Sequence, residues 1–151
     1  MNPGEAYKLR HDVWDEFLVE RSYAIEKRFE YTYAERMHDQ IKVNVEELKK
    51  HPETRQAIIQ IHNRMRDQEM MGKERIPCSM TYIFMIRDGK LDIIYYMRST
   101  DFATHFQNDI WLAMELQNWM AAQIGREVGK YIMFANSLHI YKKDWDKLTN
   151  Y

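Results

Sequence analysis

The strongest constraint on the fold is a pair of strand-like segments joined by a tight turn. Two aromatic and β-branched segments, residues 78–86 and 91–97, flank the stretch Arg87-Asp88-Gly89-Lys90. Asp-Gly between two such segments is the strongest short-range signal for a β-hairpin. We therefore predict that these segments form an antiparallel pair of strands.

Apolar periodicity and β-branched segments predict the remaining elements. In order, these are helix 6–18, helix 35–50, strand 57–61, polar loop 63–74, the hairpin, helix 109–124 and strand 128–141. Helix 109–124 has the broadest apolar face, and Gly125 is a good residue to end it. The order indicates an α+β fold with a mixed or antiparallel sheet.

Size and charge limit the partners that the chain can have. Its 151 residues, 45% of them hydrophobic, suit a single domain spanning residues 1–151 with one packed core. A net charge of -1 predicts no basic surface for nucleic acid or an anionic membrane, so we expect a small substrate. No apolar run approaches the roughly 20 residues that span a bilayer. The first five residues lack the features of a signal peptide, so we expect a cytoplasmic protein.

The chain has one cysteine, Cys78, and the residues around it suggest a nucleophile. It stands in Arg75-Ile76-Pro77-Cys78, twenty residues before Arg98-Ser99-Thr100-Asp101. A thiol followed at that interval by an arginine, a hydroxyl and a carboxylate is the layout expected for attack on a phosphorylated substrate. A nearby arginine stabilises a thiolate and can also bind phosphate oxygens in pairs. Taken alone, a cysteine in an apolar strand is more often a small core residue.

From Cys78 to Tyr141 the sequence resembles the thymidylate synthase superfamily. The family's Pro-Cys, Arg-Ser-x-Asp and His-x-Tyr motifs occur without a gap as Pro77-Cys78, 98–101 and 139–141. Residues 14–17, 29–36 and 47–55 resemble other family segments more loosely. The resemblance implies a thymidylate synthase-like fold with one sheet face used for dimerisation. It also implies a C5 transferase that acts on a pyrimidine nucleoside monophosphate, with 5,10-methylenetetrahydrofolate as cosubstrate.

The resemblance assigns a role to each motif residue. Cys78 would add to C6 of the pyrimidine, which makes C5 able to attack a one-carbon donor. Arg98 and Ser99 would bind the phosphate, and Arg55 would reach the phosphate in the other subunit of a homodimer. The remaining assignments are Tyr33 to the water network around the ring, Asp101 to the base and folate, Trp14 to the folate pocket, and His139 with Tyr141 to the sugar hydroxyl. As alternatives, His139 could be a structural histidine, Arg98 with Asp101 a local salt bridge and Trp14 a core residue.

Asp109 suggests which base is bound. In thymidylate synthases the residue thirty-one after the nucleophile is an asparagine, whose amide suits N3–H and O4 of uracil. Here Asp109 occupies that position and Asn108 lies one place early. A carboxylate accepts from the cytosine amino group and repels O4 of uracil, a mismatch of about 1–3 kcal/mol that favours cytosine. Asp109 thus resembles the deoxycytidylate (dCMP) hydroxymethylase branch, which adds water rather than hydride. A helix cap is the alternative role for this residue.

Several positions depart from the family pattern. Ser79 replaces a histidine, Met97 a glutamine, Gln56 a second arginine and His105 a glycine. The sequence also lacks counterparts of the family's early arginine loop, its ring-side glutamate and its C-terminal tail. Two alternatives therefore accompany dCMP hydroxymethylation: methylation of dUMP, and an inactive homologue that binds nucleotides. The six histidines show no metal-ligand spacing, so we expect no metal.

Overall fold

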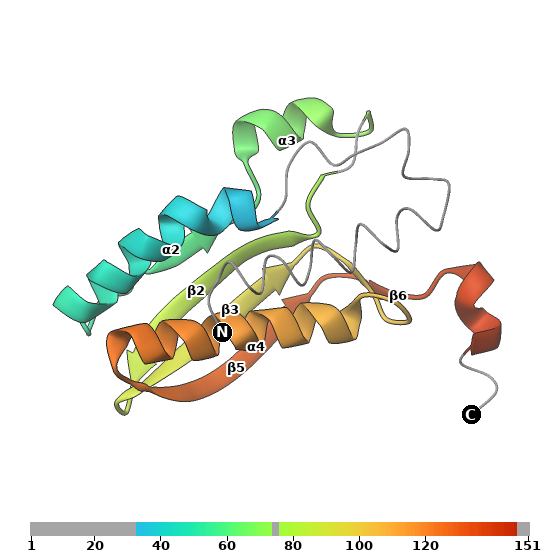
Figure 1. Cartoon of the computed structure of the whole chain (residues 1–151). Coiled ribbons are helices and arrows are strands. Elements are labelled where there is room, and N and C mark those ends of the chain that lie inside the picture. The colour runs from blue at the N-terminus through green and yellow to red at the C-terminus, as the bar shows by residue number, and fades with distance from the viewer. Residues whose placement is uncertain (1–32, 74–75, 148–151) are drawn as a thin grey trace.

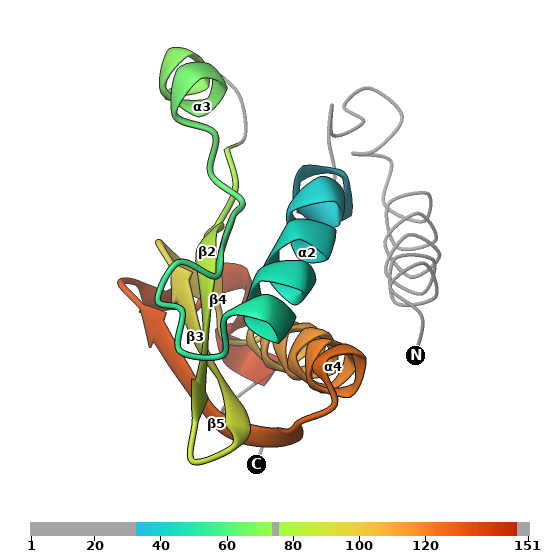
Figure 2. The same cartoon turned by 90° about the vertical axis from the view of Figure 1, so that its left-hand side faces the viewer.

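The computed structural model describes residues 33–73 and 76–147, in which helices cover one face of a mixed sheet. Figure 2 shows α2 and α4 side by side on the same face of the sheet, and α3 standing away from it. The helices are α2 (Tyr33–Lys50), α3 (Arg64–Met70) and α4 (Phe106–Ile124), followed by the 3-10 helix η1 (Lys142–Lys147). The strands are β1 (Ile58–Gln60), β2 (Ser79–Arg87), β3 (Lys90–Met97), β4 (Thr100–Asp101), β5 (Glu127–Ala135) and β6 (Leu138–His139).

The main sheet has the strand order β1-β2-β3-β5. β1, β2 and β3 pair antiparallel, whereas β3 and β5 are parallel and are joined through α4. β4 and β6 form a separate two-stranded parallel sheet. The predicted α+β class with a mixed sheet is therefore confirmed. None of the helices in residues 33–73 and 76–147 is long and apolar enough to cross a membrane.

Side chains alternate between the two faces of the main sheet, as expected for strands. The inner face packs against α2 and α4, where Phe84, Ile93 and Tyr95 are almost completely buried. The outer face carries a row of four isoleucines in register across all four strands, Ile58, Ile83, Ile94 and Ile132. An apolar outer face of this kind is typical of a surface that another protein chain covers.

The predicted hairpin is confirmed at the turn between β2 and β3. Asp88 has φ 51° and Gly89 has φ 75°. Two consecutive positive φ values are typical of the type I′ turn, which matches the twist of the flanking strands and favours glycine. Figure 1 shows this turn at the end of the sheet opposite β6.

The predicted loop at 63–74 is wrong, because residues 64–70 form α3. The segment is polar and has no apolar face, so periodicity could not reveal a helix. Its start is instead set by Asn63, whose side chain accepts hydrogen bonds from the backbone N–H groups of Met65 and Arg66. Polar capping therefore determines this helix.

The predicted strand at 128–141 is correct only as far as Ala135. The chain then bends at Asn136 and continues as β6, which pairs with β4. Asn136 N donates to the Met97 carbonyl at 3.1 Å, and Thr100 N donates to the Ser137 carbonyl at 2.9 Å. These bonds direct the chain after β5 past the end of β3 and toward β4. Helix 6–18 lies outside the described residues.

Candidate active site

Cys78 lies immediately before β2 and is half-buried. Arg98 Nη2 lies 3.7 Å and Ser99 Oγ 3.6 Å from its sulfur. The structure thus brings Arg98 and Ser99 together with Cys78.

Arg98 is held firmly by the backbone of the loop that carries the nucleophile. Its Nε donates to the Pro77 carbonyl at 2.7 Å, and Nη2 donates to the Ile76 carbonyl at 3.0 Å. Nη1 donates to Ser99 Oγ at 3.2 Å. Because a guanidinium has five N–H donors, these contacts and the one to sulfur leave a donor on Nη1 for a ligand, within the described part of the chain. Arg98 is therefore a fixed positive charge beside the sulfur.

Tyr33 contacts the backbone of Cys78 through its hydroxyl. The backbone N–H of Cys78 donates to Tyr33 Oη at 2.9 Å, and that of Ser79 does so at 3.5 Å. Tyr33 is the first residue of α2 and lies 45 positions before Cys78 in the sequence. The start of α2 therefore belongs to the site.

Four consecutive residues, 98–101, connect Cys78 with Asp109 and His139. Arg98 and Ser99 contact the sulfur, as described above. Thr100 Oγ1 donates to Asp109 Oδ2 at 3.0 Å. Asp101 pairs with His139 across β4 and β6, and Phe102 N donates to the His139 carbonyl at 2.9 Å. The motif therefore connects β3, α4 and β6 at one end of the sheet.

Asp109 lies in the first turn of α4 and is buried, with 9% of its surface exposed. The residue at the N-cap position is His105, so Asp109 does not cap the helix. Burial raises the pKa of Tyr95 and of Tyr131, and the neighbouring Tyr82 and the carboxylate of Asp109 raise both further. Asp109 therefore lies among buried phenols that stay protonated at neutral pH.

Ser79 stands where the family has a histidine and is completely buried. Its hydroxyl shares a hydrogen bond of 2.5 Å with Tyr95 Oη. Tyr95 in turn stacks on Tyr82, with ring centroids 4.4 Å apart. The residue after the nucleophile is thus connected to the phenols near Asp109.

Asp101, His139 and Tyr141 form the side of the site made by β4 and β6. Asp101 is buried, and its two carboxylate oxygens accept from Ala103 N at 3.0 Å and from the Thr104 hydroxyl. The rings of His139 and Tyr141 meet edge to face with centroids 5.0 Å apart. The structure thus brings the two rings into contact, although Tyr141 lies beyond the end of β6.

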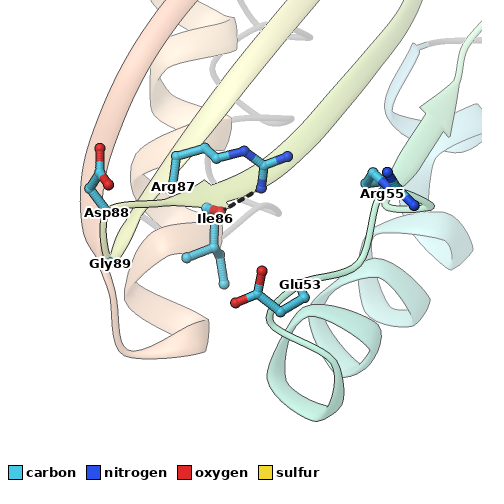
Figure 3. A pocket seen from close by; sticks show the side chains of 6 residues that line it. All are labelled: Glu53, Arg55, Ile86, Arg87, Asp88 and Gly89. Carbon is cyan, nitrogen blue, oxygen red and sulfur yellow. Dashed lines mark hydrogen bonds between the residues drawn. The ribbon is translucent and has the colours of Figure 1, made fainter.

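Arg55 lies at the far end of the sheet. It borders an open hollow of about 490 Å³ together with Glu53, Ile86 and the turn 87–89 (Figure 3). Eight strand residues separate Cys78 from Ile86, which corresponds to roughly 26 Å. Arg55 therefore does not join the site of its own chain. Trp14, the predicted folate contact, lies outside the described residues.

A second hollow, of about 330 Å³, opens on the outer sheet face beside Arg98. It is lined by Gln60, His62, Met80, Thr81, Tyr96, Met97, Arg98 and Asn136. Arg98 thus borders this outer hollow as well as contacting Cys78.

In the described residues, no group of three or more His, Cys, Asp or Glu side chains could hold a metal ion.

The motifs missed several residues that shape the site. The carbonyls of Ile76 and Pro77 hold Arg98, Thr100 holds Asp109, and Arg36 donates to the Ile61 carbonyl and to Asp67. Thr100 occupies the variable position of the Arg-Ser-x-Asp motif, so the motif itself carried no signal for it. Backbone carbonyls have no sequence signature at all.

Comparison with known proteins relates the chain to one family. A family model described as thymidylate synthase matches residues 5–151. A putative thymidylate synthase of Methanosarcina barkeri is 32% identical over 128 residues, which cover 81% of this chain and 58% of that protein. A deoxyuridylate hydroxymethyltransferase of Bacillus phage SP01 is 36% identical over 109 residues, which cover 71% of this chain and 28% of that protein. A thymidylate synthase of Streptococcus pyogenes is 28% identical over 144 residues, which cover 93% of this chain and 50% of that protein. The chain thus spans 58% or less of these relatives.

Proposed function

Because the chain belongs to the thymidylate synthase family, we propose that it transfers a one-carbon unit to C5 of a pyrimidine nucleoside monophosphate. The observation that carries this proposal is the position of the Cys78 sulfur, 3.7 Å from Arg98 Nη2 and 3.6 Å from Ser99 Oγ. A thiolate held beside a fixed cation and a hydroxyl can attack a polarised ring carbon and leave again. The preferred reaction is hydroxymethylation of dCMP.

The chemistry requires the sulfur to bond reversibly to the ring. As the thiolate of Cys78 bonds to C6, the electron pair of the C5–C6 double bond moves onto the base and makes C5 nucleophilic. Methylenetetrahydrofolate would supply the one-carbon unit that C5 accepts. Asp101 fits a pterin N–H donor, because each of its oxygens accepts one hydrogen bond from the residues that follow it and keeps a second lone pair. Loss of the C5 proton would then expel tetrahydrofolate and leave an exocyclic methylene on C5. Water would add to this methylene to form the hydroxymethyl group, and the C–S bond breaks as the C5–C6 double bond re-forms, which restores the thiolate.

The charge of Asp109 favours cytosine as the base. Thr100 Oγ1 donates to Oδ2, and a carboxylate accepts hydrogen bonds but has no proton to donate. The amino group at C4 of cytosine provides the matching donor, whereas O4 of uracil provides a second acceptor. One observation favours dUMP instead: the phage relative is named a deoxyuridylate hydroxymethyltransferase.

Replacing Asp109 by asparagine tests the choice of base. The wild-type protein is expected to favour dCMP over dUMP by about 10- to 100-fold in kcat/KM, and Asp109→Asn to reverse that order, because the amide can donate to O4. Turnover of both nucleotides with methylenetetrahydrofolate is measured, and the mass of the product separates a hydroxymethyl from a methyl group.

The matched control is Asn108→Ala, at an exposed position one residue earlier in α4. It is expected to leave the preference unchanged. A preference for dUMP in both the wild type and Asp109→Asn would contradict the cytosine assignment. If neither nucleotide gives a product while both bind, the inactive nucleotide-binding homologue becomes the better explanation.

We also propose that two copies pair through the outer sheet face, with Arg55 acting in the partner's site. The in-register isoleucine row supplies the apolar surface, and Arg55 lies too far from Cys78 to act within one chain. Antiparallel stacking of two sheets about a two-fold axis would place the Arg55 end of one copy against the Arg98 end of the other.

Mixing two inactive variants tests this shared site. Cys78→Ser and Arg55→Met are each expected to be inactive alone. An equal mixture of the two should regain about a quarter of the wild-type rate, since half of the dimers then contain one intact site. Activity is measured before and after the chains exchange. If Arg55→Met is fully active by itself, Arg55 has no role in the partner's site.

A further inference from the structure

An arginine in the first turn of α2 ties this helix to the residue after β1 and to α3. Arg36 Nη1 and Nη2 donate to the two carboxylate oxygens of Asp67 at 2.7 and 2.8 Å, and Nη1 also donates to the Ile61 carbonyl at 2.8 Å. Only 11% of the Arg36 side chain and 2% of the Asp67 side chain are exposed. Breaking a buried pair of this kind is costly, because the remaining charge is left uncompensated.

Asp67 attaches α3 to the rest of the protein. Its Oδ2 also accepts from Asn63 N at 2.7 Å, at the residue that caps α3. The hydrogen bonds from Arg36 lower the pKa of Asp67, although burial acts in the opposite direction, so the carboxylate is ionised at neutral pH. Apart from this attachment α3 stands away from the sheet (Figure 2) and makes few contacts with other described helices and strands. The ion pair is therefore its main anchor.

Two connections lead from this anchor to the nucleophile. The backbone N–H groups of Ile61 and His62 donate to the Met80 carbonyl at 2.9 and 3.2 Å, two residues after Cys78. Tyr33 precedes Arg36 by three residues on α2, so both side chains project from one side of the helix. Tyr33 Oη accepts from Cys78 N at 2.9 Å. The helix turn that Arg36 fixes is thus the turn that contacts the nucleophile.

We propose that Arg36 and Asp67 are positioning residues for Cys78. The pair fixes the first turn of α2 so that the Tyr33 hydroxyl holds the Cys78 backbone, and with it the sulfur, close to Arg98 and Ser99. Among the described residues neither member of the pair contacts the sulfur itself, so the effect passes through Tyr33. This inference rests on the proposed role of Cys78 as the nucleophile, and it adds a device that the motifs do not contain.

Alkylation by iodoacetamide tests the proposal, because Cys78 is the only thiol in the sequence. Asp67→Asn and Arg36→Met are each expected to lower the second-order rate constant at pH 7 roughly fivefold, since the sulfur moves away from the cation that favours its thiolate. At pH 10, where a cysteine ionises without help, the variants and the wild type should react at similar rates.

The matched control is Glu127→Gln, which removes the exposed ion pair between Lys90 Nζ and Glu127 Oε2 at 3.0 Å. Its rate should equal that of the wild type at both pH values. A purely structural ion pair would lower the denaturant midpoint in Asp67→Asn but leave the pH 7 rate of the folded protein unchanged. That result would overturn the proposal.

Tyr33→Phe separates the proposed route from a general loosening of the fold. It removes only the hydroxyl, and it is expected to lower the pH 7 rate as much as Asp67→Asn does. The double variant should show no further fall, because both changes act through one contact. A double variant whose fall in rate equals the product of the two single falls would overturn the proposal.

If Asp67→Asn does not fold, Arg36→Lys gives the same test. It keeps the charge but loses the paired geometry, so its alkylation rate should fall by less. Alkylation requires no nucleotide turnover, so its outcome is separate from that of the proposed function.

Discussion

Replacing Cys78 by serine is expected to abolish turnover, with a loss of about 10³-fold or more in kcat for both dCMP and dUMP. A serine hydroxyl is not ionised near neutral pH, so no thiolate would be available to add at C6. Release of tritium from C5-labelled nucleotide measures this step directly, because that hydrogen leaves only after the sulfur has bonded to the ring. Mass spectrometry of the protein with a C5-fluorinated nucleotide should show the covalent adduct in the wild type and none in Cys78→Ser.

Serine differs from cysteine by one atom, so the fold is expected to survive the change. Equal thermal unfolding of Cys78→Ser and the wild type, and retained nucleotide binding, would show that only the chemistry is lost. Tritium release at the wild-type rate in Cys78→Ser would contradict the covalent route. The absence of release from both proteins, with binding intact, would instead favour the inactive homologue.

Replacing Arg98 should have the second-largest effect. Arg98→Met removes the cation 3.7 Å from the sulfur together with the hydrogen bonds to the Pro77 and Ile76 carbonyls. The loss of several charge-assisted hydrogen bonds is expected to lower kcat/KM by roughly 10²-fold or more. The rate of alkylation of Cys78 at pH 7 should fall as well, because the thiolate loses its neighbouring charge. Arg98→Lys should recover little, since an ammonium cannot reproduce the planar set of donors.

Arg126→Met is the matched control for Arg98. Arg126 is exposed just after the C-cap of α4, and the next residue, Glu127, pairs with Lys90 at the turn end of the sheet. This variant loses one positive charge just as Arg98→Met does, but far from the sulfur. It should therefore retain wild-type alkylation and turnover. Full activity in Arg98→Lys would mean that charge alone is needed, and that the fixed geometry of the guanidinium is not.

The parts of the fold that sequence predicted best are those set by local chemistry. The turn at Asp88-Gly89 was predicted because two positive φ values suit those residues. Helix 109–124, which begins earlier in the structure, at Phe106, was predicted because apolar residues recur on one face. α3 was missed, since a polar helix held by a cap and one ion pair has no apolar period. The end of β5 was missed because Asn136 and Ser137 bend the chain through pairing with distant strands.

Motif spacing predicted the motif residues of the candidate site, but not the contacts that hold them in place. The spacing predicts a site that joins Arg98 and Ser99 to Cys78, and the structure brings these three residues together. Spacing could not indicate that two nitrogens of Arg98 donate to backbone carbonyls, because every residue has a carbonyl. Nor could it indicate Arg36, whose partner Asp67 lies 31 residues away in a segment without a recognisable pattern. The support around the nucleophile therefore became visible only in three dimensions.

The parallel pairing of β3 and β5 has a consequence for the order in which the protein folds. β3 ends at Met97 and β5 begins at Glu127, so the segment that contains α4 lies between the two paired strands. Such distant pairing is slow, because the entropy of closing the intervening loop is lost before any contact is gained. β6 follows β5 directly and places His139 opposite Asp101. Until β5 docks, the edge of β3 is uncovered and His139 has no place beside Asp101, so the site is complete only once this distant pairing has formed.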